Sequence, residues 1–204
     1  MKTKKLFEVA RKTTDKSTIE NKATETAVKL SKQKDTLYVS LRETNGTFKD
    51  WFFNFWFCRK YGYHRGFLIK TLSIYPQLLK KLHKYNKDEI NNIIVLGFSQ
   101  GGATGAIVYK RFKKMFKDKN VEAHLFAAPR AFTLLNYIKD KDLFDNLTRY
   151  QISKDLVTKV PFGIFGFKHV GNEIKLKSNY TIFNVVGNHH PDTYEKLLAE
   201  KDLD

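Results

Sequence analysis

The residues best suited to chemistry lie in one stretch, Gly97-Phe98-Ser99-Gln100-Gly101. An apolar run precedes it, and small residues that suit a helix follow it. Strand, sharp turn and helix with a serine at the apex make the G-x-S-x-G nucleophile elbow, which exposes a serine hydroxyl above the end of a strand. The backbone N–H of Gln100 would then lie at a helix N-terminus, where it can donate to a developing oxyanion. Bare matches to this motif are often ordinary glycine-rich turns, but the flanking strand and helix favour a nucleophilic Ser99.

A serine nucleophile needs a base to accept its proton and a carboxylate to orient that base. Asp155 follows a predicted strand, and His189 and His190 lie just before the last predicted helix. Serine, acid and histidine follow one another in this order in α/β-hydrolases. Taken singly, Asp155 could cap a turn and the two histidines could be polar loop residues or a helix cap. Only the combination predicts a catalytic triad, with either histidine as the base.

Four other histidines are alternatives as the base on composition alone. They are His64, His83, His124 and His169. His64 precedes the elbow, His124 lies within a predicted strand and His83 lies on a predicted helix. Chain order and placement therefore disfavour these three.

Strands and helices alternate along the chain from residue 37 onwards. The hydropathy pattern predicts strands at 37–41, 93–96, 121–126, 147–152, 171–177 and 180–186, helices at 68–85, 101–117, 133–138 and about 188–198, and a loop at 160–169. Such alternation predicts an α/β fold with a mainly parallel sheet flanked by helices, in which chemistry gathers at the carboxyl ends of the strands.

The first residues differ in character from the rest. Residues 1–34 are polar, with apolar residues at helical spacing, namely Leu6, Val9, Ala10, Ile19, Ala23, Ala27, Val28 and Leu30. We expect two parts, an N-terminal basic helical segment at 1–36 and the main α/β-hydrolase domain at 37–204. The helical segment is expected to pack on the flank of the domain, with a basic amphipathic contact to a membrane as the alternative.

Charge is the outlier of the composition. The chain has 37 Lys and Arg against 21 Asp and Glu, a net charge of +16. This field favours anionic partners such as an anionic lipid surface, although a biased composition that places lysine at tolerant surface positions is an equal explanation. No nucleic-acid motif accompanies it, so nucleic acid is not expected as a partner.

Cysteine content and hydropathy bear on the compartment. The single cysteine, Cys58, excludes an internal disulfide and fits a reducing compartment. No apolar run has the length of a secretory signal or a membrane-spanning helix. A cytoplasmic protein is therefore expected, with peripheral membrane association left open.

Six further blocks resemble the pattern of one family, the class 3 or fungal-type triacylglycerol lipases. Residues 42–44 with 50–51 resemble its R-G-T…D-W, 63–67 its V-H-x-G-F, 126–130 its F-G-x-P-R, 155–161 its D-x-V-x-x-x-P, 167–171 its Y-x-H-x-G, and 189–194 its H-x-x-x-x-Y. The resemblance runs from about Leu37 to Leu198 and implies an α/β-hydrolase fold.

The resemblance also implies roles for individual residues. Ser99 would be the nucleophile and Asp155 the orienting acid. His189 would be the base, because Tyr194 follows it at the family spacing. Thr44 and the Gln100 amide would form the oxyanion hole, and His64 and His169 would be structural. The aromatic run at 48–57 would be a lid that opens onto lipid, and no metal or cofactor is implied.

Three departures from the family pattern bear on the substrate. Glu43 replaces the glycine of R-G-T, the elbow reads Gly97-Phe98-Ser99-Gln100-Gly101 instead of G-H-S-L-G, and the chain is short. We therefore expect a serine hydrolase of lipid or hydrophobic acyl esters acting near an anionic membrane surface. The alternatives are a carboxylesterase or acyl-thioesterase, and a non-catalytic anionic-lipid-binding protein on a hydrolase scaffold.

Overall fold

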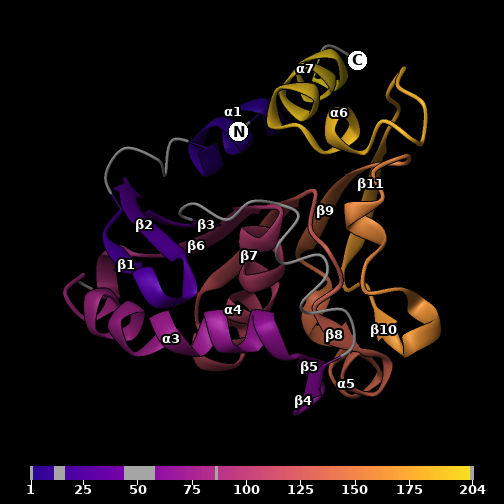
Figure 1. Ribbon diagram of the computed structural model, residues 1–204. Helices are drawn as coiled ribbons and strands as arrows, with labels where there is room; N and C mark the ends of the chain where they lie inside the picture. The colour runs from indigo at the N-terminus through magenta and orange to yellow at the C-terminus, as the bar shows by residue number, and fades with distance from the viewer. Residues whose placement is uncertain (1, 12–16, 44–57, 86, 203–204) are drawn as a thin grey trace.

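The structure is a computed structural model that describes residues 2–11, 17–43, 58–85 and 87–202. These residues form three layers, with a sheet in the middle (Figure 1). Helices α3 (Arg65–Leu82) and α4 (Gln100–Met115) cover one face of the sheet, and α1 (Thr3–Arg11) and α7 (Pro191–Lys201) pack together on the other.

Within the described residues the main sheet has seven strands in the order β1-β2-β3-β6-β7-β9-β11. β1, β2 and β3 are antiparallel, and every pairing from β3 to β11 is parallel. The expectation of a mainly parallel sheet flanked by helices is confirmed. The strands are β1 (Ile19–Asn21), β2 (Thr26–Gln33), β3 (Thr36–Glu43), β6 (Asn92–Phe98), β7 (Asn120–Phe126), β9 (Leu147–Ile152) and β11 (Asn172–Leu176).

A smaller antiparallel sheet lies beside the main one and carries short connecting elements. Its order is β10-β8-β5-β4, with β10 (Phe167–Lys168), β8 (Phe132–Thr133), β5 (Tyr63–His64) and β4 (Arg59–Lys60). Helix α5 (Leu134–Lys139) follows β8, and helix α6 (Val185–His189) directly precedes α7. Single 3₁₀ turns lie at Lys22–Thr24, Lys87–Glu89, Lys141–Phe144, Val157–Lys159 and Gly163–Phe165.

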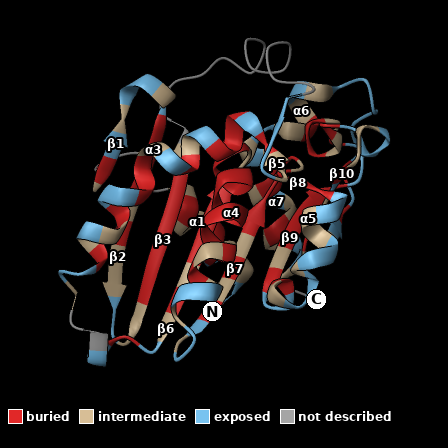
Figure 2. Cartoon of the chain, turned by 90° about the horizontal axis from the view of Figure 1, so that it is seen from below, coloured by how far each residue is buried: buried red, intermediate tan, exposed pale blue. Residues whose placement is uncertain are grey.

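Alternation along the central strands divides the core between the two faces of the sheet. Val95 and Leu125 belong to the apolar cluster under α3 and α4, whereas their neighbours Leu96 and Phe126 belong to the cluster under α1 and α7. Successive strand side chains point to opposite faces, so two covered faces require an unbroken apolar run. The central strands are accordingly buried along most of their length (Figure 2).

The predicted helix over residues 19–34 is wrong, because β1 and β2 occupy most of it. Ile19 pairs with Val28, and all eight residues of β2 pair with β3. Ala23, a member of the predicted apolar stripe, is exposed. The β-branched Thr26 and Val28 suit a strand, and pairing with β3 outweighs the helix-like spacing. The domain boundary predicted between residues 36 and 37 falls at the first residue of β3.

The predicted strand at 180–186 is also wrong. Residues 181–183 lie in a turn, and helix α6 begins at Val185. The Asn184 side chain accepts a hydrogen bond from the Gly187 N–H at 2.8 Å. This is an N-cap, which satisfies a backbone donor at a helix start and so favours helix over strand.

Helix α1 packs on the protein, as the sequence indicated. Leu6, Phe7 and Ala10 are buried, and the Phe7 ring packs edge-on against Phe126 with centroids 4.9 Å apart. The favoured interpretation of this segment as a flanking helix is confirmed for residues 3–11. None of the helices in the described part of the chain has the length and apolar character needed to cross a membrane.

Candidate active site

The turn between β6 and α4 holds Ser99 in an unusual backbone conformation. Its φ is 53° and its ψ is −124°, a region that costs energy for any residue other than glycine. Neighbouring glycines make this turn fit. A Cβ on Gly97 would lie 2.4 Å from the Gly101 carbonyl oxygen, and a Cβ on Gly101 would lie 2.3 Å from the carbonyl oxygen of Leu41. The geometry is that of a nucleophile elbow.

His189 links Ser99 to Asp155. Its Nε2 lies 2.8 Å from the Ser99 Oγ, and its Nδ1 lies 2.8 Å from the Asp155 Oδ2. A neutral imidazole that donates its Nδ1–H to the carboxylate presents Nε2 as the acceptor of the serine proton. The structure therefore brings together serine, histidine and acid in the arrangement that activates a serine hydroxyl.

Asp155 is fully buried just after β9 and accepts three hydrogen bonds. They come from His189, from the hydroxyl of Tyr194 at 2.8 Å and from the backbone N–H of Val157 at 3.0 Å. Burial raises the pKa of Tyr194 well above its ordinary value, and the nearby Asp155 charge raises it further. The phenol therefore stays protonated and can donate. These bonds stabilise a buried carboxylate that would otherwise be costly.

Packing and a buried amide position His189. The Phe98 ring lies 5.3 Å from the imidazole and 5.6 Å from the Tyr194 ring. Asn188 is fully buried, accepts a hydrogen bond from the Ser178 hydroxyl and donates to the Thr181 carbonyl oxygen at 2.8 Å. The imidazole therefore packs against the Phe98 ring, and hydrogen bonds fix Asn188, the residue before it in the chain.

His190, the alternative base, lies elsewhere. Its side chain is about half exposed, its Nδ1 accepts a hydrogen bond from the Asp192 N–H at 3.3 Å, and it caps the start of α7. The structure thus brings His189, and not His190, to Ser99 and Asp155.

The remaining histidines have structural surroundings or lie at the surface. His64 is buried against the Phe67 ring at 4.6 Å, and the Nε2 of His169 lies 2.8 Å from the Thr158 carbonyl oxygen. His124 lies 3.1 Å from the Tyr150 hydroxyl, and His83 is exposed at the end of α3.

The two predicted oxyanion donors are only partly described. Gln100 is the first residue of α4, so its backbone N–H belongs to the helix turn whose amides lack intrahelical acceptors. Its side chain is buried, and its Nε2 has no acceptor among the described residues. Thr44 directly follows β3 and lies outside the described residues, as does the predicted lid at 48–57.

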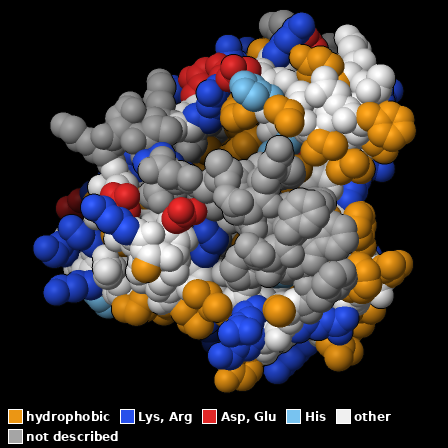
Figure 3. All heavy atoms as spheres, in the orientation of Figure 1, with side chains coloured by type: hydrophobic (Ala, Val, Ile, Leu, Met, Phe, Trp, Pro, Cys, Tyr) orange, Lys and Arg blue, Asp and Glu red, His pale blue; other side chains and the backbone are white. Residues whose placement is uncertain are grey.

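Exposed apolar side chains lie directly before His189 in the chain. They are Tyr180, Ile182, Phe183 and Val186. Figure 3 shows hydrophobic side chains gathered over the α6 region, at the upper right of that view. Soluble surfaces rarely leave such groups together without a partner. Within the described ranges, no group of three His, Cys, Asp or Glu side chains could hold a metal ion.

Three contacts of the site were not assigned roles from the sequence. They involve the Tyr194 hydroxyl, the Val157 amide and the Phe98 ring. Tyr194 carried a signal, because it is the tyrosine of H-x-x-x-x-Y. The other two depend on how the chain turns after β9 and at the elbow, which residue spacing does not reveal.

Comparisons with known proteins agree on one family. The family model described as lipase, class 3, matches residues 10–165, more than half of the chain. The comparison with curated proteins finds no match.

Solved structures of fungal lipases are similar in fold. Lipase II from Rhizopus niveus matches with a TM-score of 0.68 and 21% identity, over 78% of this chain and 65% of its own. The triacylglyceride lipase of Rhizomucor miehei matches with a TM-score of 0.67 and 21% identity, over 81% and 66%. A triacylglycerol lipase with a serine protease triad as its catalytic centre matches with 0.64 and 21%, over 76% and 63%. The fold is therefore the α/β-hydrolase fold, and the chain spans just under two thirds of each.

Proposed function

The chain belongs to the class 3 lipase family, and from this membership we propose that it is a serine ester hydrolase that cleaves acyl esters of lipids. The observation that carries the proposal is the unbroken hydrogen-bond path from the Ser99 hydroxyl through His189 to Asp155. Such a path is what lets a serine act as a nucleophile near neutral pH.

In the first half of the proposed reaction, the Ser99 Oγ attacks the ester carbonyl carbon while His189 Nε2 takes the hydroxyl proton. The tetrahedral intermediate then collapses, the bond to the alcohol oxygen breaks, and His189 returns the proton to the leaving alcohol. Asp155 remains ionised and stabilises the imidazolium through the Nδ1–H. The product is an acyl-enzyme on Ser99.

In the second half, water takes the place of the alcohol. His189 accepts a proton from water as its oxygen attacks the acyl carbon, and then returns it to the Ser99 Oγ as the carboxylic acid leaves. The negative oxygen of both intermediates is stabilised by the Gln100 backbone N–H at the start of α4, with Thr44 proposed as the second donor.

Lipid is the proposed substrate class because of the surroundings of the base. The exposed apolar side chains that precede His189 in the chain, of which Phe183 is 90% exposed, are better suited to contact an acyl chain or a lipid surface than to contact water. An anionic lipid surface as the setting is proposed from the net charge of +16.

The test compares hydrolysis of a short-chain and a long-chain p-nitrophenyl ester, with and without anionic vesicles. Ser99→Ala and His189→Ala should abolish turnover, whereas His190→Ala is the matched control and should keep it. Activity on the long-chain ester should rise when vesicles are added.

Two outcomes would contradict the proposal. Activity that survives in His189→Ala but is lost in His190→Ala would assign the base to the neighbouring histidine. A folded wild type that hydrolyses no ester and is not labelled by a fluorophosphonate probe would exclude a serine hydrolase.

A further inference from the structure

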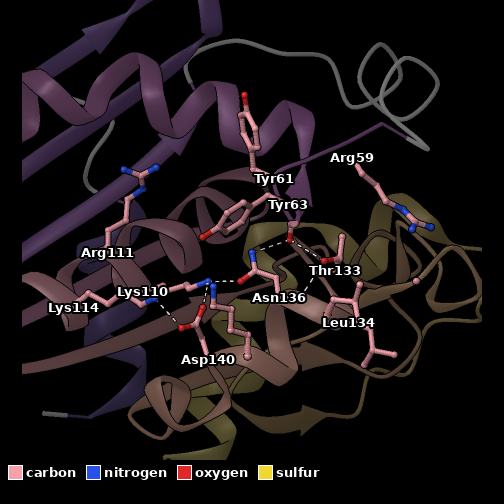
Figure 4. A pocket seen from close by; sticks show the side chains of 14 residues that line it. Arg59, Tyr61, Tyr63, Lys110, Arg111, Lys114, Thr133, Leu134, Asn136 and Asp140 are labelled. Atoms are coloured by element: carbon pink, nitrogen blue, oxygen red, sulfur yellow. Dashed lines mark hydrogen bonds and ion pairs between the residues drawn. The ribbon is translucent and has the colours of Figure 1, made fainter.

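A cavity lies between α4, α5 and the β4–β5 hairpin, on residues that the proposed reaction does not use. Its volume is about 840 Å³, within the roughly 300–1,000 Å³ typical of ligand sites. Five basic side chains and one carboxylate line it, namely Arg59, Lys110, Arg111, Lys114, Lys139 and Asp140. Figure 4 shows Lys110, Arg111 and Lys114 on α4, Asp140 directly after α5 and Arg59 on the hairpin. The cavity is therefore strongly cationic.

Lys110 forms the fixed floor of this cavity. Its side chain is 5% exposed, its Nζ lies 2.6 Å from the Asp140 Oδ2, and it also donates to the Asn136 side-chain oxygen. The Tyr63 ring lies over the ammonium, 5.1 Å from Nζ to the centroid. Asn136 in turn donates to the Gly62 carbonyl oxygen at 2.9 Å. Helix α4, helix α5 and the hairpin are thus tied together at one buried charge (Figure 4).

Asp140 neutralises only one of the two lysines that contact it. Its Oδ1 lies 2.7 Å from the Nζ of Lys114, a side chain that is about half exposed. Burial alone would raise the pKa of Asp140, but hydrogen bonds from Lys110 and Lys114 outweigh it and lower the pKa below its ordinary value. The carboxylate therefore stays charged at neutral pH and is shared by two ammonium groups. The group of two ammonium ions and one carboxylate therefore carries one excess positive charge at the cavity lining.

Large apolar side chains border the same cavity and face solvent. Tyr61, Leu134 and Leu135 belong to its lining, and Leu135 and Tyr61 are each 81% exposed. Ile138 lies on the same short helix α5, directly before Lys139 in the chain, and is 57% exposed. A site for a soluble anion requires basic side chains, but exposed aliphatic side chains add nothing to the binding of such an anion. Apolar side chains interleaved with basic ones are typical of surfaces that lie in the interface of an anionic bilayer.

The cavity is separate from the candidate triad along α4. Ser99 precedes the first residue of that helix, and Lys110 comes eleven residues later, which at 1.5 Å per residue is about 16 Å. Headgroup binding at the cavity therefore leaves the serine hydroxyl unoccupied.

We propose that this cavity binds the phosphate of an anionic phospholipid in a bilayer, while Leu134, Leu135, Ile138 and Tyr61 enter the interface beside it. Lys114 and Lys139 contact the phosphate, and Lys110 with Asp140 holds Lys114 in place. The inference rests on the proposed function and deepens it by naming a docking surface for lipid in addition to the exposed apolar group before His189. Docking itself requires no hydrolysis, so it is measured on protein that cannot react.

The test measures binding of full-length Ser99→Ala protein to sedimented vesicles. One set is phosphatidylcholine and the other is equimolar phosphatidylcholine and phosphatidylglycerol, whose net charge is that of its phosphate. Strong binding is expected only to the second set. Lys114→Gln with Lys139→Gln should weaken it about tenfold or more, because each basic group near an anionic surface contributes roughly a fivefold factor.

Matched control variants distinguish binding at this cavity from binding through positive charge spread over the whole surface. Lys80→Gln with Lys84→Gln removes the same charge from exposed positions at and just after the end of α3 and should change binding less than about twofold, because neither lysine lines the cavity. Leu135→Gln should weaken binding several-fold, whereas Leu72→Gln, an exposed leucine on α3, should not. Should the double variant fail to fold, Lys139→Gln alone tests the charge, because Lys139 is exposed.

Two results would overturn the docking proposal. Equal weakening by the cavity pair and the α3 pair would mean that binding is diffuse. Tripolyphosphate binding that depends on Lys114 and Lys139, with no effect of either on vesicle binding, would assign the cavity to a soluble anion. The cavity variants in protein with Ser99 should keep full activity on a soluble short-chain ester, so that failed docking and failed hydrolysis remain distinguishable.

Discussion

Asp155 is the most constrained member of the candidate triad, because three donors share its two oxygens in a fully buried position. One of them, Tyr194, also accepts a hydrogen bond from the Ile152 N–H at 3.0 Å. It therefore ties the acid to the end of β9. We regard Tyr194 as a positioning residue, since it touches Asp155 and not the proposed reacting atoms.

Tyr194→Phe should lower kcat by about tenfold with little change in KM. Loss of the hydroxyl leaves the Asp155 carboxylate one donor short and frees it to move relative to His189, and an unsatisfied buried group costs about 1–3 kcal/mol. Steady-state kinetics on a soluble ester tests this. Tyr150→Phe is the matched control, because that buried hydroxyl contacts His124 and not the triad. Unchanged kcat in Tyr194→Phe would show that the Tyr194 hydroxyl is not required to position Asp155 for catalysis.

His169 makes stability depend on pH. Burial lowers its pKa well below the ordinary value of 6.5, and the Arg149 and Arg130 charges lower it further. The unfolded chain therefore binds a proton near pH 6.5 that the folded chain does not. Stability from this group is present above pH 6.5 and is lost as pH falls below it, by at most about 1.4 kcal/mol per unit.

The expected result is a free energy of unfolding that declines from pH 7 to pH 5. His169→Gln, whose amide can still donate to the Thr158 carbonyl, should flatten that decline. Urea titrations at several pH values measure both slopes. Equal slopes in wild type and variant would assign the decline to other groups.

At the scale of single residues, the sequence predicted which residues form the candidate triad better than it predicted the contacts that position them. Chain order and the elbow motif selected Ser99, Asp155 and the histidine pair, because a triad needs those side-chain types in any fold. Spacing alone left His189 and His190 open, since adjacent residues differ only in the direction of their side chains. The end of α6 and the start of α7 decide that direction, and neither boundary was predicted correctly.

Among the elements, α1 contributes more than its position at the start of the chain suggests. Phe7 packs against Phe98, with centroids 5.9 Å apart, and Phe98 lies against the His189 ring. Arg11 pairs with Glu195 of α7 at 2.6 Å, and Asp202 accepts a hydrogen bond from the Lys4 N–H at 2.7 Å. The first and last helices therefore brace each other above the candidate site.

Phe7→Ala should lower the free energy of unfolding by about 3–5 kcal/mol, because it removes a fully buried ring and leaves a cavity. Lys5→Ala on the exposed side of the same helix is the control and should stay within about 0.5 kcal/mol of wild type. Urea denaturation monitored by circular dichroism compares the two. A small effect of Phe7→Ala would mean that α1 is only loosely attached.

Elements with one dominant signal were predicted, and elements with competing signals were not. The strand before Ser99 is a nearly unbroken apolar run, which predicts a buried strand. The strand before Asp155 mixes apolar with polar residues and was nevertheless predicted at its observed bounds, Leu147–Ile152. Residues 19–33 carry both helix-like spacing and β-branched residues, and the decision came from pairing with β3. Residues 180–186 carry an apolar alternation that the Asn184 cap overrides.

For the whole molecule, alternation of strands and helices was enough to predict a parallel sheet with covered faces. What it could not predict is the surface. The net charge of +16 is a sum over the chain, and only the fold places Lys110, Lys114 and Lys139 around one cavity. Composition suggested an anionic partner, and the folded surface indicates where it would bind.

The place of β11 in the sheet order affects how the protein should respond to stress. β11 is the last strand of the main sheet and pairs only with β9 among the described strands, yet the chain that follows it carries His189 (Figure 1). Proteins unfold locally in cooperative units that differ in their free energy of opening. We expect a low free energy of opening for a unit made of an edge strand and the short helices that follow it. Ser99, in contrast, stands on the central β6.

Residual activity should therefore vanish at a lower urea concentration than the far-UV circular dichroism signal, with dilution restoring it. Coincident midpoints would contradict this. If the midpoints differ as expected, loss of activity reports local unfolding of the segment from β11 to α7, while the rest of the protein stays folded. Mild stress would switch the enzyme off without committing it to aggregation or degradation.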